Sequence, residues 1–574
     1  MTTLAPLHRW RPPSADLPDP DLAREAARLG LGERALRILV GRGDRTVADL
    51  AGYLEAPPAG LHDPHLLPDA DLLWRRIRAA RDRHERVLIF GDFDADGLTG
   101  LTIMVEALRA LGIDAMPYVP DRQAEGHGLS RAAIEEAQRG GRTLIVTVDT
   151  GTTSVAEVEV AVGAGVDVII TDHHHVPERL PPATAIVNPH RPGTGYPDVR
   201  LAGTGVAFKV AQLLMSDLPG GAEAALALAE LAAIGTVADV APILGENRVI
   251  ARLGLRRLRE VPRPGIAALL AAARIAPASV DLETIGFAIA PRLNAAGRMG
   301  DACVAANLLL ASTQAEAEPL AATLEEANRS RRDLTARVLE EASGIVAGDV
   351  GVAAVVVVGD WPVGIIGLVA GRLAERSGKP AVVFSRAQEP WRGSARSVSG
   401  FDLAAAFDAC GAIFERHGGH PQAAGCEIRP ERFETFRARF ETLVAASPSA
   451  AEPTLGLDLI VEALEVDYLL HRELAVLEPT GPGNPRPLLG ISGLTVTRAR
   501  SVSGGHAQLT LRKGREVLDG IAFERPDLAE LPAGLAIDLV ARLASRTFGG
   551  YETLQLEVVD AATSGTLASM MVTP

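Results

Sequence analysis

The chain has 574 residues, 47% of them hydrophobic and 22% charged; this is the balance of a folded, water-soluble protein, and the length predicts about three or four domains. Its formal net charge of −15 argues against a protein that coats nucleic acid through uniform positive charge, so a nucleic-acid path would have to be a local basic stripe. The three cysteines, Cys303, Cys410 and Cys426, have no CxxC spacing and indicate neither a disulfide framework nor a thiolate zinc site.

The first 80 residues contain helical patches broken by prolines, and we interpret residues 1–80 as a small helical lead-in. Their first segment, MTTLAPLHRWRPP, lacks the uninterrupted apolar stretch of a signal peptide. Apolar runs elsewhere, such as VAAVVVV at 352–358, are too short to span a membrane. We therefore expect a cytoplasmic protein without membrane attachment.

Residues 81–320 begin with an alternation of strands and helices. Short apolar runs rich in β-branched residues lie at 87–90, 143–148 and 166–170, and helical stretches lie between them. This alternation is typical of βαβ units in a parallel sheet. From about residue 205 the pattern is helical, which predicts a helical extension of the same domain.

A long connecting helix is predicted over 321–347, and a second α/β domain is predicted over 348–448. The segment SPSAAEP at 447–453 resembles a linker. Residues 449–574 hold short strands separated by glycine and asparagine turns, which is the pattern of a small all-β barrel. The expected fold class is a multidomain α/β protein that ends in a β-barrel.

Acidic residues and histidines follow the strands of the predicted parallel sheet. Because ligands bind outside the carboxyl ends of the strands in such sheets, these side chains should meet at one rim. They are Asp92, Asp94 and Asp96 after the first strand, Asp149 after the second, and Asp172, His173, His174 and His175 after the third. A further motif, VADVAP, places Asp239 at the end of a helical segment.

So many carboxylates in one place are costly unless cations compensate them. Hard divalent ions prefer oxygen ligands, and Mn²⁺ also accepts an imidazole. Two such ions about 3.5–4 Å apart could clamp a phosphodiester and generate a hydroxide nucleophile. The alternative is that each aspartate only caps the next helix, which is a fair explanation for any one of them. Four acidic motifs beside three adjacent histidines favour the metal site.

The motifs DFDADG, VDTG, DHH and VADVAP, in that order, resemble the four motifs of the DHH phosphoesterase superfamily. Further elements resemble its RecJ branch, the single-stranded-DNA exonucleases; they lie at 120–130, 290–300, 393–403, 418–425 and 477–487. The resemblance covers about residues 70–560, and the order of the motifs makes the set specific. It implies that the second α/β domain is a DHHA1-like substrate-binding domain and that the barrel is an OB-fold-like nucleic-acid-binding domain.

Carried over to this chain, the resemblance implies two divalent ions, Mn²⁺ or Mg²⁺, in the catalytic site. The implied metal ligands are Asp94, Asp96, Asp149, His173 and Asp239, with Asp149 as the bridge between the ions. Asp92 and His174 are expected to bind an ion or to orient a ligand, and His174 is counted with the catalytic residues. His175 is an additional histidine that we interpret as structural or solvent-facing.

The chain departs from the family pattern at three places. Phe90 stands where many relatives have a histidine, so one metal would depend more on water or on Asp92. His127 replaces an aromatic residue that is common in relatives. The second α/β domain reads Trp361-Pro362-Val363-Gly364, without the histidine that is often found there.

A 5′-terminal phosphate is best held by arginine forks, hydroxyls and backbone amides. The alternative is that the arginines only pair with nearby acids. His420 could contact the scissile phosphate or be a packed structural residue, and His127 could stack on a base. The substrate-binding residues that the resemblance implies are Arg122, His127, Arg292, Asn294, Arg298, Ser394, Arg396, Gly419 and His420.

The barrel carries basic residues that would otherwise be taken for a solvated face, namely Arg498, Arg500, Arg512, Lys513 and Arg515. The family resemblance makes them candidates for binding single-stranded DNA. It also makes a single-strand-binding protein and a RecQ-type helicase plausible partners of a chain that we expect to be a monomer.

The favoured function is a metal-dependent 5′→3′ exonuclease that hydrolyses single-stranded DNA to mononucleotides in recombination and repair. One alternative is a DHH phosphodiesterase that acts on short oligonucleotides or cyclic dinucleotides, against which the C-terminal barrel argues. A non-catalytic single-stranded-DNA-binding scaffold is the other alternative, and the intact acidic motifs argue against it.

Overall fold

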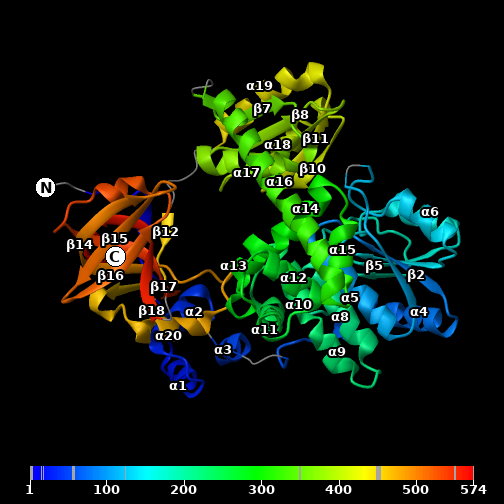
Figure 1. Ribbon diagram of the computed structural model, residues 1–574, viewed down its shortest axis with the longest axis horizontal. Helices are drawn as coiled ribbons and strands as arrows, with labels where there is room; N and C mark the ends of the chain where they lie inside the picture. The colour runs from blue at the N-terminus through cyan, green and yellow to red at the C-terminus, as the bar shows by residue number, and fades with distance from the viewer. Residues whose placement is uncertain are drawn as a thin grey trace. The chain divides into compact units, whose positions relative to one another are not determined.

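The computed structural model describes residues 4–14, 16, 18–44, 46–54, 58–122, 124–347, 351–447, 454–548 and 551–572. Figure 1 gives the order of the helices and strands. Apart from Ser447, the predicted linker at 447–453 lies outside the described residues, as do the predicted boundaries at 348 and 449.

The first α/β domain contains a five-stranded parallel sheet with the strand order β3-β2-β4-β5-β6. The order reverses between β2 and β4, which is where parallel α/β sheets open a crevice at their carboxyl ends. The strands are β2 (Arg86–Gly91), β3 (Asp114–Tyr118), β4 (Leu144–Val148), β5 (Asp167–Thr171) and β6 (Ala185–Val187). The prediction of parallel βαβ units is confirmed.

Helices cover both faces of this sheet. Helix α5 contacts β2, β3 and β4 on one face, and residues of α6 and α7 share a buried cluster with residues of β2, β4 and β5 on the other. Phe90 belongs to this buried cluster and stacks on Tyr118 with a centroid distance of 5.7 Å, so it is a core residue. The helices are α4 (Ala70–Asp82), α5 (Ala95–Ala110), α6 (Arg131–Arg139) and α7 (Val155–Gly163).

The predicted helical extension follows the sheet. It comprises α8 (Gly203–Met215), α9 (Gly221–Ala227), α10 (Ala229–Ala238), α11 (Gly245–Glu260), α12 (Pro264–Ala272), α13 (Leu282–Thr284), the π-helical turn η3 (Ile285–Ile289), α14 (Ala290–Met299) and α15 (Cys303–Leu310). Among the described residues, the helical stretch Gly221–Ala238 is apolar and long enough to cross a membrane by composition, yet 61% of it is buried inside the structure, as in a core helix. The connecting helix α16 (Gln314–Ala347) starts seven residues before the predicted 321.

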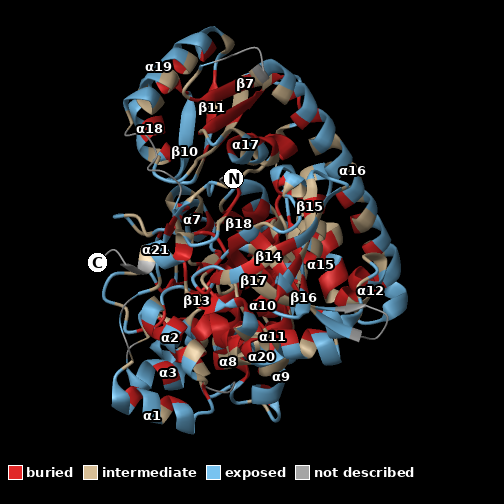
Figure 2. Ribbon diagram, turned by 90° about the vertical axis from the view of Figure 1, so that its left-hand side faces the viewer, coloured by how far each residue is buried: buried red, intermediate tan, exposed pale blue. Residues whose placement is uncertain are grey.

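The second α/β domain has a mixed sheet with the order β10-β11-β9-β8-β7, in which β7 and β8 are parallel and the other pairs are antiparallel. Its strands are β7 (Val355–Gly359), β8 (Ala381–Ser385), β9 (Trp391–Arg396), β10 (Arg416–His420) and β11 (Ala423–Ile428). Helix α17 (Val363–Ser377) packs on one face, and α18 (Leu403–Ala409) and α19 (Phe433–Ala446) pack on the other. The edge strand β10 is exposed along its length (Figure 2).

The C-terminal strands close into a five-stranded barrel of order β14-β15-β16-β18-β17, with β17 pairing back to β14. The pair β16–β18 is parallel, and the short helix η8 (Pro526–Glu530) lies between β16 and β17 in sequence. This is the topology of an OB-fold, as predicted. The strands are β14 (Leu489–Val502), β15 (His506–Lys513), β16 (Glu516–Ala522), β17 (Ala536–Phe548) and β18 (Tyr551–Thr563), and β13 (Leu459–Glu462) pairs with β14.

Of the basic residues predicted on the barrel, Lys513 is buried, and its ammonium donates a hydrogen bond to the carbonyl of Val466. Lys513 therefore does not belong to an exposed basic surface, because its charge is used inside the domain. The residues that are exposed are Arg498, Arg500, Arg512 and Arg515.

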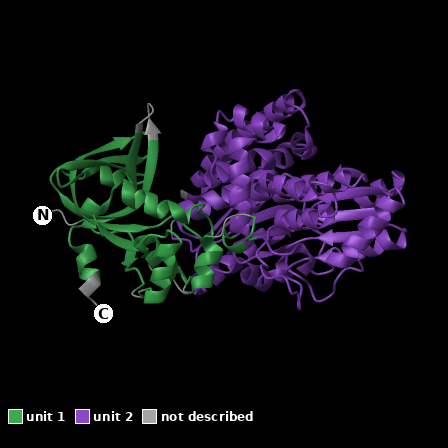
Figure 3. Cartoon of the chain, turned by 90° about the horizontal axis from the view of Figure 1, so that it is seen from below, with its two compact units in different colours: residues 1–60, 242–245, 451–574 green, residues 61–241, 246–450 purple. Residues whose placement is uncertain are grey.

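The N-terminal helices share a hydrophobic core with the barrel. They are α1 (Pro20–Arg28), α2 (Glu33–Arg42) and α3 (Val47–Leu54), and the strand β1 (Arg9–Arg11) pairs with β12 (Thr454–Gly456). The chain accordingly divides into one unit of residues 1–60, 242–245 and 451–574 and a second unit of residues 61–241 and 246–450 (Figure 3). The predicted lead-in 1–80 is thus shared, since α4 belongs to the second unit.

Candidate metal centre and end-binding pocket

The turn from β2 to α5 carries the first three aspartates. Oδ1 of Asp94 accepts hydrogen bonds of 3.0 Å from the backbone N–H groups of Asp96 and Gly97, so Asp94 is the N-cap of α5. Asn294 supports the same turn, because its Oδ1 accepts the N–H of Ala95 at 2.7 Å. Asp94 therefore caps a helix, as the capping interpretation expects.

Asp96 is 2% exposed and is held by the first turn of another helix. Its two carboxylate oxygens accept the N–H groups of Gly203 and Thr204, each at 2.8 Å, at the start of α8. Gly235 of α10 lies so close that an added Cβ would be 2.6 Å from Oδ1 of Asp96. The two hydrogen bonds fix the orientation of the Asp96 carboxylate. A residue larger than glycine at position 235 would leave no room for it.

Asp149 follows β4 with a φ of 60°, in the left-handed region where aspartate is among the tolerated side chains. Its backbone N–H donates to the carbonyl of Thr171 at 2.9 Å, which ties the end of β4 to the end of β5. An added Cβ on Gly203 would lie 2.5 Å from Oδ1 of Asp149. The start of α8 therefore packs directly against both Asp96 and Asp149.

The histidines after β5 are oriented by Asp172. One oxygen of Asp172 lies 2.7 Å from Nδ1 of His174, and the other accepts the N–H of Thr152 at 2.9 Å. Burial alone would raise the pKa of Asp172, but these partners hold it well below its usual range. The hydrogen bond to Asp172 in turn raises the pKa of His174 to about 9. His175 is exposed.

The predicted ligands lie together. Nε2 of His173 is 3.1 Å from Oδ1 of Asp149 and 3.8 Å from Oδ2 of Asp96, and its Nδ1 is 3.9 Å from Oδ2 of Asp239. Potential ligand atoms lie within 4.8 Å of one another in each of two separate trios, Asp92, Asp94 and Asp149, and Asp96, His173 and Asp239. A third trio, Asp149, His173 and His174, shares one residue with each of them. Overlapping trios of this kind suit two neighbouring ions.

The electrostatics of the cluster point in the same direction. Burial, together with repulsion between the carboxylates, raises the pKa of Asp94 and Asp149, and raises that of Asp96 and Asp239 to about 6. Asp239 also ends α10, where the helix dipole disfavours a negative charge. Oδ1 of Asp149 and Nε2 of His173 are buried without a hydrogen-bond partner in the described part of the chain. These donor atoms fit divalent cations.

A loop before α6 borders the cluster. The guanidinium of Arg122 lies 4.8 Å from the ring centre of Phe93, and the ring of His127 lies 4.6 Å from the same ring. Nδ1 of His127 is 3.4 Å from Oδ2 of Asp92, while its side chain is 70% exposed. His127 thus presents an exposed ring beside the acidic cluster, as its predicted stacking role requires.

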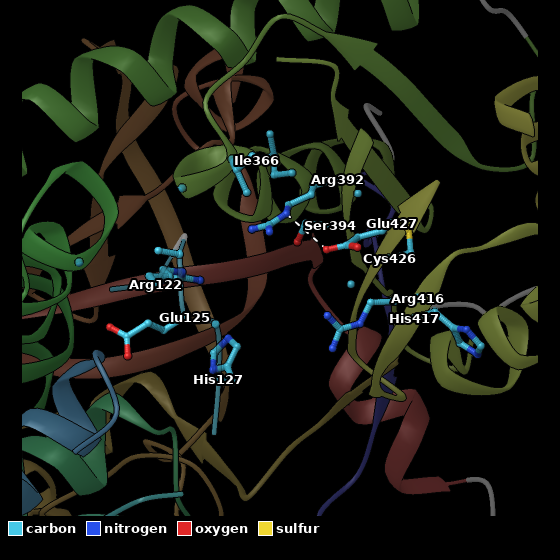
Figure 4. A pocket seen from close by; sticks show the side chains of 17 residues that line it. Arg122, Glu125, His127, Ile366, Arg392, Ser394, Arg416, His417, Cys426 and Glu427 are labelled. Atoms are coloured by element: carbon cyan, nitrogen blue, oxygen red, sulfur yellow. Dashed lines mark ion pairs between the residues drawn. The ribbon is translucent and has the colours of Figure 1, made fainter. Parts of the chain in front are cut away.

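A pocket with a volume of about 470 Å³ lies between this loop, the start of α17 and the strands β9, β10 and β11 (Figure 4). Three of the predicted substrate-binding residues line it, namely Arg122, His127 and Ser394. Arg392 and Arg416 also line it and were not predicted. The alternation of side chains along a strand could have identified Arg392, which is two residues from Ser394.

Arg298 and Arg396 lie beside Arg122. Arg298 donates to the carbonyl of Gly364 at 3.0 Å, and burial together with the neighbouring arginines lowers its pKa to about 9. Burial and proximity to Arg122 also lower the pKa of Arg396. Within the described residues none of these three arginines forms an ion pair with a carboxylate. Clustered, desolvated cations without acidic partners favour an anionic ligand.

Arg298 and Arg396 do not line the pocket themselves, and neither do the four remaining predicted substrate-binding residues. Arg292 pairs with Glu325 of α16 at 2.6 Å, so for this residue the alternative of a structural ion pair holds. Asn294 supports Ala95, as described above. Gly419 has a φ of 151° and His420 is exposed, both on the edge strand β10. A substrate role for these four residues stays a prediction.

Three family models match the chain in sequence order. The DHH family N-terminal domain matches residues 86–236, the DHHA1 domain matches residues 349–446, and the RecJ OB domain matches residues 457–560. Together they cover the parallel-sheet domain, the mixed-sheet domain and the barrel.

Among curated proteins, the single-stranded-DNA-specific exonuclease RecJ of Bacillus subtilis is 34% identical over 98% of this chain and 72% of its own length. The protein of the same name from Thermus thermophilus is 35% identical over 98% of this chain and 78% of its own length. Crystal structures of Thermus thermophilus RecJ superpose with TM-scores of 0.82 in complex with Mn²⁺ and 0.77 in complex with Mg²⁺, at 31% and 30% identity; they cover 96% and 97% of this chain and 79% and 78% of the other. The chain therefore belongs to the RecJ family of single-stranded-DNA-specific exonucleases.

Proposed function

We propose that the chain is a metal-dependent exonuclease that hydrolyses single-stranded DNA from its 5′ end to mononucleotides, in DNA recombination and repair. The observation that supports this best is a juxtaposition. A cluster of acids and histidines adjoins three arginines, Arg122, Arg298 and Arg396, that form no ion pair with a carboxylate among the described residues. The contact between Asp92 and His127 links the cluster to the loop that carries Arg122. Such a pair of sites suits a strand whose terminal phosphate is held while a nearby phosphodiester is cleaved.

We propose that Asp94, Asp96, Asp149, His173 and Asp239 hold two divalent ions, Mn²⁺ or Mg²⁺, with Asp149 between them. Asp92 lies in one trio with Asp94 and Asp149, so it could also bind an ion. His174 lies in another trio with Asp149 and His173, so it could do the same. When bound, two such ions supply Lewis-acid stabilisation of the charge that develops on the phosphate. The buried, unpartnered oxygen of Asp149 and nitrogen of His173 support this assignment, since each would gain a partner.

The three arginines without ion pairs, together with Ser394, would set the polarity. Arg122, Arg298 and Arg396, with the hydroxyl of Ser394, would bind the 5′-terminal phosphate through charge-assisted hydrogen bonds. The ring of His127 would stack on a base between this phosphate and the acidic cluster. A strand entering with its 3′ end would lack a terminal phosphate to satisfy these cations, and cleavage would therefore start at the 5′ end.

The OB-fold barrel would also bind single-stranded DNA. Its exposed arginines Arg498, Arg500 and Arg512 lie on the neighbouring strands β14 and β15. A basic surface on this fold suits the backbone of single-stranded nucleic acid. It favours a long single strand over the alternative substrates, which are short oligonucleotides and cyclic dinucleotides.

We further infer that the protein is a cytoplasmic monomer that works with a single-strand-binding protein and a RecQ-type helicase. This inference follows from family membership and from the chemistry of the substrate, because a duplex must be opened before a single-strand exonuclease can act. Co-sedimentation of the purified chain with each candidate partner, and its mass in solution, would test it.

The decisive experiment digests single strands labelled at the 5′ or the 3′ end, in EDTA and with Mn²⁺ or Mg²⁺. We expect the 5′ label to be released first, as a mononucleotide, and only with metal. A dinucleotide substrate in parallel separates this function from a small-phosphoester activity. Early release of the 3′ label, or faster hydrolysis of the dinucleotide than of the long strand, would overturn the proposal.

A further inference from the structure

The face of the mixed sheet that borders the pocket carries three rows of residues, each read across β9, β11 and β10. One row is Arg392, Glu427 and Arg416; the next is Ser394, Gly425 and Gly418; the third is Arg396, Ala423 and His420. Residues directly opposite one another in antiparallel strands point to the same face. The middle row has no large side chain, so it forms a low floor between two rows that carry positive charge.

The floor is open at its centre. A Cβ added to Gly425 would have no neighbour closer than 3.8 Å, and one added to Gly418 would have none within 4 Å. Adjacent rows on one face of a strand are about 6.6 Å apart, two residues at about 3.3 Å each. The row of Arg392 therefore lies one step along the sheet from Ser394, which already belongs to the proposed site of the terminal phosphate.

Arg416 has no acidic partner. Within the described residues its side chain makes neither an ion pair nor a hydrogen bond, and in Figure 4 its guanidinium points into the pocket while His417 points away from it. Arg392 approaches Glu427 only at 3.5 Å, and its guanidinium also points into the pocket. One carboxylate between two guanidinium groups leaves this row with one uncompensated positive charge.

The other acid of the pocket does not compensate it. The carboxylate of Glu125 accepts hydrogen bonds from the hydroxyl groups of Tyr118 and Ser130 and from the N–H of Asp121, so it anchors its own loop. This face of the sheet consequently carries arginines on both sides of the floor, with Arg396 in one flanking row and Arg392 and Arg416 in the other.

We propose that Arg392 and Arg416 form a second phosphate site, one row away from the site of the terminal phosphate. It would bind the β-phosphate of a 5′-diphosphorylated or 5′-triphosphorylated end, because the next phosphodiester along the strand is the bond that is cleaved at the metal centre. The proposal rests on the proposed function in one respect, namely that Ser394 and Arg396 hold the terminal phosphate.

Calorimetric binding to the full chain in EDTA tests the proposal without any hydrolysis. The probes are thymidine 5′-monophosphate, thymidine 5′-diphosphate and the 5′-phosphorylated dinucleotide of thymidine, which carry one phosphate, two terminal phosphates and one terminal plus one internal phosphate. We expect thymidine 5′-diphosphate to bind about tenfold more tightly than the monophosphate, the gain of one charge-assisted contact. The dinucleotide should show no gain that depends on Arg416, because its internal phosphate would lie at the metal centre, and such a gain would overturn the proposal.

Arg416→Gln and Arg392→Gln should each remove most of the gain for the diphosphate and leave the affinity for the monophosphate unchanged. Arg416→Lys, which keeps the charge but not the fork, should retain part of it. Arg376→Gln is the matched control, because Arg376 is exposed in the last turn of α17 and does not line the pocket. Circular dichroism of each variant checks that it is folded.

Two further results would overturn the proposal. One is an equal loss of affinity for all three probes in Arg416→Gln, which would assign Arg416 to the terminal phosphate. The other is no loss for any probe. Failure of the exonuclease assay with a normal Arg416-dependent gain would refute the nuclease function alone, so the two failures are distinguishable.

Discussion

Oδ1 of Asp149 lies 3.1 Å from Nε2 of His173, and both atoms are buried without a hydrogen-bond partner in the described part of the chain. The two residues follow the neighbouring parallel strands β4 and β5, and Asp149 has a left-handed φ of 60°. An unsatisfied buried polar atom costs about 1–3 kcal/mol. These two unpartnered atoms therefore make the free energy of folding less favourable. A cation bound by both of them would offset this cost.

Asp149→Asn should abolish cleavage while single-stranded DNA still binds. The substitution keeps the size of the side chain but removes the charge that we place between the two ions. We expect cleavage to slow by about 10³-fold, equivalent to about 4 kcal/mol of transition-state stabilisation. Rates come from single-turnover digestion, and binding comes from fluorescence anisotropy in EDTA.

Asp333→Asn is the control for this substitution, because Asp333 is exposed on α16 and belongs to none of the three trios. It should leave both cleavage and binding unchanged. Cleavage by Asp149→Asn at the wild-type rate would contradict the assignment of the metal centre.

The stability of the metal-free protein should fall as the pH rises from about 4 to above 6. Burial and repulsion from Asp94 raise the pKa of Asp96 to about 6 in the folded chain, against an ordinary value of 3.8. In this window the folded state keeps a proton that the unfolded state has released, so raising the pH favours unfolding. The pKa values of Asp94 and Asp149 are raised as well, and add to the trend.

Thermal unfolding in EDTA at about pH 5 and about pH 7.5 measures this effect. We expect a melting temperature several degrees lower at the higher pH, and Mn²⁺ should reverse the difference because it replaces the protons. In Asp149→Asn the fall should be smaller, since one repelling carboxylate is gone. An equal fall in both proteins would show that other groups cause it.

Asp172→Asn should weaken metal binding without removing any of the proposed ligands. Oδ1 of Asp172 lies 2.7 Å from Nδ1 of His174 and orients its ring. The same oxygen accepts the backbone N–H groups of His173 and His174 and so fixes the backbone of both histidines. Loss of a residue that orients a ligand typically costs about 10–100-fold in metal affinity. Isothermal titration with Mn²⁺ measures the change, and His175→Asn, at an exposed position next to these histidines, should show none.

The local features of the site could be predicted from the sequence. The strands before Asp92, Asp149 and Asp172 are short, buried and rich in β-branched residues, and parallel strands bring their carboxyl ends to one edge. The C-terminal β-barrel followed from short strands with regular turns, and its assignment as an OB-fold followed from the family resemblance. The connecting helix begins at Gln314 and not at the predicted 321; Pro319 lies inside it, at a place where a proline usually argues against a helix.

Features that depend on distant partners could not be predicted. The amides that hold Asp96 come from Gly203 and Thr204, more than a hundred residues away, and no local pattern indicates that contact. Arg292 has the side chain of a phosphate ligand, but the fold pairs it with Glu325, which is 33 residues away in the sequence. The place of Arg416 in the pocket depends on how β10 and β11 align, and periodicity within one strand does not determine that alignment.

Gly235→Ala should destabilise the protein and slow cleavage, although alanine is the better helix former. In an open helix this change raises the free energy of unfolding by about 0.5–1 kcal/mol. Here the new Cβ would lie 2.6 Å from Oδ1 of Asp96 and 2.5 Å from Oγ1 of Thr99, and such overpacking costs about 1–3 kcal/mol. The net result should be a loss of about 1–2 kcal/mol, with a weaker affinity for Mn²⁺ as Asp96 shifts. Gly344→Ala in α16, where nothing lies within 4 Å, should instead stabilise the chain and leave cleavage unchanged; denaturant unfolding of both variants would reveal whether the opposite signs hold.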